Sequence, residues 1–262
     1  MSTRLKVWSL LLLGTNYNTT NNNTNNLILP ESECIEQHVL EADIKRTRAD
    51  IDIFCTTLHR NNIQIILQTF CIKHSIQYKQ GMNEVLAPFI YLYPINNNIP
   101  YNLFEAFLFR YLQRYYCIDS SCYLFKSFRL FNILLSYHDP QLALHLQINE
   151  FYPELYTLQW FLTLYARTLP LHYVLKLWDM FICIDDPAYP FFIGICLLCK
   201  HRGSLLLADV CSIPEIITGV GLKIEREGDV GVVVAEALVL HRKTPRYTTI
   251  PYLYVCICVY SF

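Results

Sequence analysis

The sequence predicts an all-α fold, and two observations carry that prediction. Apolar residues recur with a mixed spacing of three and four, typical of a helix buried on a broad face, as in Leu103, Ala106, Phe107, Phe109, Tyr111 and Leu112. Alternating strands bounded by glycine-rich turns are absent, and the 262 residues include only 8 glycines. We therefore expect one multi-helix domain over residues 1–225, followed by an irregular tail over 226–262.

The first element, residues 1–14, has two interpretations. Arg4 and Lys6 precede a short apolar run, which is the layout of a signal peptide. Asn18 and Asn22 also stand in matches to the N-glycosylation acceptor, as in a secreted protein. Against this, the run is short for a leader, and most of the 11 cysteines lie singly inside apolar segments, as buried thiols do in a reducing compartment. We expect a cytosolic protein.

The next elements are loops and helices. Residues 15–26 (TNYNTTNNNTNN) form a low-complexity polar insert and predict a mobile surface loop. A shorter Asn run at 96–98 predicts a loop between helices. The stretch 158–184 predicts two helices that Pro170 separates. After residue 225 the chain is β-branched and aromatic, and an irregular tail, a strand and the start of a further domain all stay open.

Several classes of function are excluded. A net charge of −1 offers no basic field for nucleic acid. Neither 190–199 nor 252–262 approaches the roughly 20 apolar residues that span a bilayer. The chain has no GxxxxGK[ST] loop and no GxSxG elbow, so we expect no nucleotide site of its own and no serine nucleophile. Cys196, Cys199 and His201 have zinc-like spacing but apolar surroundings, so we expect core cysteines and no metal.

Two polar clusters stand out. Leu40, Asp43 and Arg46 recur every three residues, so on a helix they share one side, and Asp43 can hold the guanidinium of Arg46 in a fixed direction. The same spacing also fits a plain surface helix with one ion pair, worth a few tenths of a kcal/mol. The second cluster, 78–83 (YKQGMN), places polar side chains and a rare glycine directly before the apolar run 85–93.

Four motifs, in order, resemble those of the TBC domain family, whose members activate Rab-type small GTPases. Residues 4–8 (RLKVW) are similar to the family's RxxxW, and residues 40–46 (LEADIKR) to its IxxDxxR with Leu in place of Ile. Residues 78–83 are similar to its YxQGMN, and 160–179 to its C-terminal signature. The resemblance covers roughly residues 4–220. It implies an all-α TBC-type domain whose first helix replaces the apparent signal peptide.

The resemblance implies a role for each motif residue. Arg46 is expected to act as an arginine finger and Gln80 as a glutamine finger, both inserted into the site of the GTPase. Around them, Asp43 is expected to orient Arg46, Tyr78 to support the loop, Gly81 to let its backbone turn, and Asn83 to cap the following helix.

The remaining motif residues are expected to be structural. We expect Arg4 and Trp8 to brace the first helix. Core and helix-packing positions are expected for Trp160, Arg167, Trp178 and Asp179, with Arg167 or Asp179 in a buried ion pair.

The function implied is that of a GTPase activator, without an enzyme activity or cofactor of its own. GTP and Mg²⁺ are carried by the partner, a Rab-family GTPase in its GTP-bound form. The alternative is a catalytically silent TBC scaffold in membrane traffic, because segment 127–146 resembles a branch that includes adaptors. In both cases we expect a cytoplasmic protein recruited to endomembranes through its partners. A secreted, glycosylated helical protein is the third possibility.

Overall fold

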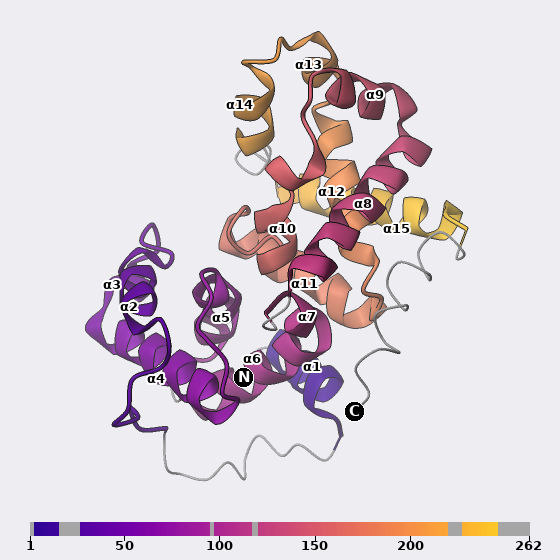
Figure 1. The fold of residues 1–262 in the computed structure, drawn as a ribbon. Coiled ribbons are helices and arrows are strands. Elements are labelled where there is room, and N and C mark those ends of the chain that lie inside the picture. Colours follow the sequence, from indigo (N-terminus) through magenta and orange to yellow (C-terminus); the bar gives the residue numbers. More distant parts are fainter. Residues whose placement is uncertain (1–2, 16–26, 95–96, 117–119, 220–226, 246–262) are drawn as a thin grey trace. The chain divides into compact units, whose positions relative to one another are not determined.

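The structure is a computed structural model, and it describes residues 3–15, 27–94, 97–116, 120–219 and 227–245 (Figure 1). Every regular element in these ranges is helical, so the all-α prediction is confirmed. The chain divides into two compact units, Met1–Ile118 and Asp119–Phe262, each with its own buried side chains. The Asn-rich insert lies almost wholly outside the described residues.

The first unit is built around two helices with many buried residues, α4 and α5. Its elements are α1 (Thr3–Leu13), α2 (Gln37–Arg46), α3 (Asp52–Cys55), α4 (Thr57–Lys73), α5 (Met82–Leu92), α6 (Asn98–Phe107), the π-helical turn η1 (Leu108–Leu112) and α7 (Gln113–Tyr116). The side chain of Thr56 caps α4 by accepting from the backbone N–H of His59. Helix α5 packs against α2, α4 and α6, which fixes where its first turn lies.

Helix α1 confirms the expected first helix. Trp8 is buried, and its ring meets Phe89 of α5 edge-on with centroids 5.8 Å apart. The predicted loop at 96–98 is wrong at its last residue, because α6 already begins at Asn98. No helix of the described ranges is long and apolar enough to cross a membrane.

The second unit surrounds α12, in which every residue from Tyr189 to Leu198 is buried. Around it pack α8, α11, α13 and α15. The elements of this unit are α8 (Ser121–His138), α9 (Pro140–Ile148), the 3₁₀ turn η2 (Pro153–Leu155), α10 (Leu158–Thr163), α11 (Leu171–Ile184), α12 (Tyr189–Lys200), α13 (Arg202–Leu207), α14 (Ile213–Thr218) and α15 (Glu227–Lys243). Pro170 precedes α11 and so separates two helices, as predicted.

Helix α15 corrects the expected irregular tail. The valines and glycines of this segment favour strand or loop by local propensity. However, Val230, Val233 and Ala237 recur at helical spacing and are buried. The carbonyl of Val234 also accepts from the hydroxyl of Tyr189 in α12, at 2.9 Å. Burial against α11 and α12 therefore overrides the propensity. Residues 246–262 lie outside the described part.

Gly194 in α12 gives the first prediction. A Cβ at this position would lie 2.9 Å from Phe131 and 2.9 Å from the hydroxyl of Tyr165, which is itself held by the carbonyl of Pro190. We expect Gly194→Ala to lower the free energy of unfolding by about 1–3 kcal/mol through overpacking. Urea unfolding followed by circular dichroism measures the change.

The matched control is Gly203→Ala in α13, where nothing lies within 4 Å of the added Cβ. This substitution should stabilise by roughly 0.5–1 kcal/mol, because alanine is the better helix former. Equal effects of the two substitutions would contradict the packing argument.

Candidate functional site

The site begins with the carboxylate of Asp43, which is only 1% exposed near the end of α2. Its Oδ1 accepts from Nε of Arg46 at 2.7 Å and also contacts Nη2 of the same guanidinium. The side chain of Arg46 is 55% exposed. The predicted i,i+3 contact is therefore present, and it joins a buried anion to a cation at the surface.

A closed ring of hydrogen bonds joins α2 to the segment that contains YKQGMN. The hydroxyl of Tyr78 lies 2.7 Å from Oδ2 of Asp43 and 3.2 Å from Oδ1 of Asn83. The amide of Asn83 donates to the hydroxyl of Thr47 at 2.9 Å. Thr47 in turn donates to the backbone carbonyl of Asp43 at 2.8 Å, which closes the ring. All four side chains are buried.

The tyrosine hydroxyl has one proton to donate. The shorter contact, to the charged carboxylate, takes the larger share, because hydrogen bonds to ionised acceptors are the stronger ones. Burial and then the bond to Asp43 raise the pKa of the Tyr78 hydroxyl far above its ordinary value. Tyr78 therefore remains a donor at every physiological pH and holds the second oxygen of Asp43.

Gln80 and Gly81 form the turn directly before α5. Gly81 has φ of 106°, a left-handed conformation that favours glycine, and its carbonyl accepts from the N–H groups of Glu84 and Val85. Gln80 is exposed. The expectation that Asn83 caps α5 is wrong: Gly81 is the cap residue, and Asn83 lies inside the first turn with its side chain directed to Thr47 and Tyr78.

Three residues at the site escaped the sequence reasoning, namely Thr47, Arg48 and Glu84. Nε of Arg48 lies 3.0 Å from Oε2 of Glu84, and the two side chains are 8% and 13% exposed. Burial lowers the pKa of the Arg48 guanidinium, while the carboxylates of Glu84 and Asp50 oppose that shift. A signal was present, because Glu84 is the one acidic residue in the otherwise uncharged run 80–93.

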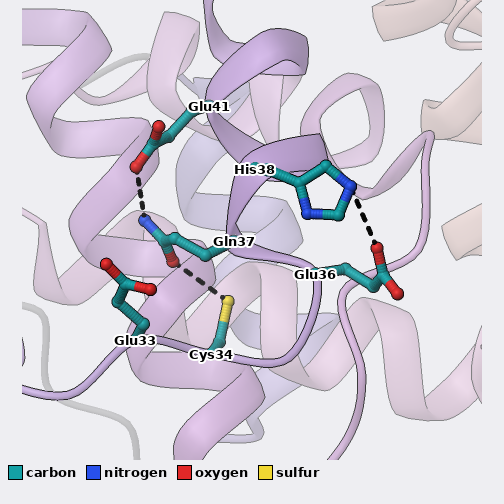
Figure 2. Close-up of a pocket in the computed structure, with 6 residues that line it drawn as sticks. All are labelled: Glu33, Cys34, Glu36, Gln37, His38 and Glu41. Atoms are coloured by element: carbon teal, nitrogen blue, oxygen red, sulfur yellow. Dashed lines mark hydrogen bonds and ion pairs between the residues drawn. The ribbon is translucent and has the colours of Figure 1, made fainter.

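Figure 2 shows a pocket at the start of α2, lined by Glu33, Cys34, Glu36, Gln37, His38 and Glu41. Its side chains contact one another. Gln37 forms hydrogen bonds with Cys34 and Glu41, and the His38 ring lies within ion-pair distance of the Glu36 carboxylate. Three of its six residues are glutamates, so its charge repels the phosphates of a nucleotide. Within the described ranges, no cluster of three or more His, Cys, Asp or Glu is arranged to hold a metal ion.

The other motif residues belong to α1 and to the second unit. Arg4 is half-buried on α1, close to the buried Trp8. In the second unit Trp160 and Trp178 are buried as expected, and the indole N–H of Trp178 donates to the carbonyl of Leu164 at 2.9 Å.

Arg167 and Asp179 differ from the expectation. Asp179 is half-buried, whereas Arg167 is exposed and has Nη1 3.4 Å from Oε1 of Gln159. The core position expected of Arg167 is therefore wrong. The chain turns at Leu164 and Tyr165, both of which have positive φ, and ends α10 before it reaches Arg167.

The ring gives the second prediction. Tyr78→Phe removes the donor to Oδ2 of a carboxylate that is 1% exposed, so we expect it to destabilise the protein by about 1.5–3 kcal/mol. Tyr101→Phe is the matched control, because Glu105 keeps its contacts with Lys73 and His74 when the hydroxyl of Tyr101 is lost. Chemical denaturation compares the two variants, and an equal loss in both would contradict the importance of the ring.

Comparison with known proteins identifies the family. The model of the Rab-GTPase-TBC domain (RabGAP-TBC) matches residues 1–206. A "TBC domain-containing protein kinase-like protein" of Gallus gallus is 28% identical over 218 residues, which cover 80% of this chain and 23% of that protein. A protein of the same name in Dictyostelium discoideum is 31% identical over 176 residues, which cover 66% of this chain and 16% of that protein.

The fold has been seen before. The crystal structure of the Ypt/Rab-GAP domain of Gyp1p matches with a TM-score of 0.66 at 19% identity, covering 95% of this chain and 80% of that chain. The chain spans less than a quarter of the two curated relatives named above. Because the family model matches well over half of the 262 residues, the chain belongs to the Rab-GTPase-TBC domain family.

Proposed function

We propose that this chain is a GTPase-activating protein, which accelerates GTP hydrolysis by a Rab-type small GTPase through two side chains supplied in trans. The family makes a Rab GTPase the expected partner. GTP and Mg²⁺ belong to that partner, so the chain itself performs no chemistry on a nucleotide of its own. It works in the cytoplasm and reaches endomembranes through the proteins that it binds.

Arg46 is the proposed arginine finger. In phosphoryl transfer, negative charge develops on the transferred group, and a planar guanidinium that stays charged neutralises it. Such an arginine is worth on the order of 10³–10⁵ in rate, or about 4–7 kcal/mol of barrier. The contact with Asp43 uses two of its nitrogens and sets the plane of the fork, while the side chain stays about half exposed.

Gln80 is the proposed glutamine finger. Its amide would hold the attacking water and take the place of the glutamine of the GTPase. The exposed turn before α5 suits this role, because Gly81 and the hydrogen-bonded Asn83 fix the backbone on its C-terminal side, and Tyr78 fixes it on the other. Little conformational entropy of this turn therefore remains to be lost when the partner binds.

One observation carries the proposal. Hydrogen bonds join the segment that carries Arg46 to the segment that contains Gln80, through Asp43–Tyr78 and Thr47–Asn83. Both proposed fingers are exposed on segments whose backbones those buried contacts hold. A surface helix with an incidental ion pair has no need of a buried network of this kind.

The third prediction tests this function by single-turnover GTP hydrolysis with a panel of GTP-loaded Rab proteins. We expect strong acceleration of at least one Rab by the wild-type chain, and a loss of roughly 10³-fold or more with Arg46→Ala. Arg46→Lys should recover little, because a point charge lacks the planar fork. Gln80→Ala should also remove most of the acceleration.

Two matched controls accompany these variants. Gln77→Ala changes an exposed glutamine of the same loop, which donates to Glu36. Arg129→Ala changes an exposed arginine of α8 in the second unit. Both should keep wild-type acceleration. A folded chain that binds a GTP-loaded Rab but accelerates no member of the panel would establish the alternative function, a silent scaffold.

A further inference from the structure

Arg48 is a buried arginine only two residues beyond the exposed Arg46. Its side chain is 8% exposed, and its backbone has φ of 44°, a left-handed conformation that is unfavourable for a residue with a side chain. Its carbonyl accepts from the N–H of Ile51 in the turn before α3. A strained and desolvated position of this kind persists only where its surroundings hold it firmly.

Glu84 supplies that hold from the other segment. Its carboxylate lies 3.0 Å from Nε of Arg48 and is itself largely buried. It occupies the first turn of α5, where a negative charge is also favoured by the helix dipole. Burial makes each member of the pair depend on the other, because removing one partner of a buried ion pair is strongly destabilising.

The pair continues a series of contacts between the two segments. The side chain of residue 46 is exposed, residue 47 is hydrogen-bonded to Asn83, and residue 48 forms an ion pair with Glu84. A slip of one residue would move a Cα by 3.8 Å, whereas a misplacement of about 1 Å at a catalytic group costs on the order of 10²-fold in rate. Relative placement of the two segments therefore matters more to function than the stability of either.

We propose that Arg48 and Glu84 are positioning residues, whose buried ion pair sets the register between the segment that carries Arg46 and the loop that carries Gln80. This inference rests on the proposed function, which it deepens by naming what aligns the two fingers. The pair acts through Arg46 and Gln80 and touches no substrate itself.

The fourth prediction concerns Arg48→Met, Glu84→Gln and the double variant Arg48→Met/Glu84→Met in the full chain. Single-turnover hydrolysis at several activator concentrations separates the maximal rate from the half-saturating concentration. Below the unfolding temperature, we expect the single variants to lose about tenfold or more in maximal rate, with the half-saturating concentration changed by less than about threefold.

The double variant separates alignment from stability. An apolar pair can replace a buried ion pair with little or no loss of stability, so its melting temperature should return toward wild type while its maximal rate stays low. Lys73→Met is the control, since it breaks an exposed ion pair with Glu105 in the same unit and should change neither parameter. A double variant that regains the full rate, or folded single variants with the wild-type rate, would overturn the inference.

A second readout does not depend on hydrolysis. Amide hydrogen exchange should become faster over residues 78–85 in Arg48→Met and over residues 44–51 in Glu84→Gln, because each change releases the opposite segment. If the wild-type chain accelerates no Rab but this reciprocal effect appears, the proposed function fails and the register stands. If both variants keep the wild-type exchange rates in these segments, the inference that the pair sets the register is overturned, whatever the hydrolysis assay gives.

Discussion

The need to solvate one buried carboxylate organises this site. Asp43 is 1% exposed, and a buried charge is tolerated only when hydrogen bonds replace the water that it loses. Its two oxygens divide the task, since Oδ1 faces Arg46 on its own helix and Oδ2 faces Tyr78, thirty-five residues away. The same anion therefore sets the direction of an exposed arginine and holds down the loop that presents Gln80.

The apolar core of the first unit makes this arrangement rigid. Tyr78 leads into α5, whose buried face includes Val85, Leu86 and Phe89, and Trp8 closes on that face from α1. A densely packed interior has low compressibility, so the first turn of α5 holds the residues before it in a fixed position. The proposed function needs such rigidity, because preorganised groups stabilise a transition state without reorganising during the reaction.

The sequence anticipated what depends on local spacing or local backbone chemistry. The contact between Asp43 and Arg46 follows from their i,i+3 spacing. The turn at Gly81 was implied by the resemblance of the motif, and glycine adopts its left-handed conformation without steric cost. The contacts of Asn83 with Thr47, and of Arg48 with Glu84, did not follow, because both join segments about 36 residues apart and no periodicity records them.

Tertiary contacts also explain the two larger differences between the expected and the observed structure, at α15 and at Arg167. Helix α15 forms because α11 and α12 bury Val230, Val233 and Ala237, a gain that the local propensity of valine and glycine does not reveal. Arg167 is exposed because α10 ends early, at two residues with positive φ. In both cases the local sequence is compatible with more than one structure. The tertiary contacts that select one of them cannot be read from the sequence.

Arg46 and Arg48 show how environment divides the work of two identical side chains. The side chain of Arg46 is about half exposed, although the carboxylate that it contacts is buried, so in the proposed function a phosphoryl group can approach the guanidinium from solvent. Arg48 meets its carboxylate in the interior, where breaking a buried ion pair is strongly destabilising. The left-handed turn at Arg48 sends it inward while Arg46 stays outside. In the proposed function, Arg48 belongs to the fold, whereas Arg46 meets the partner with a direction that Asp43 has already set.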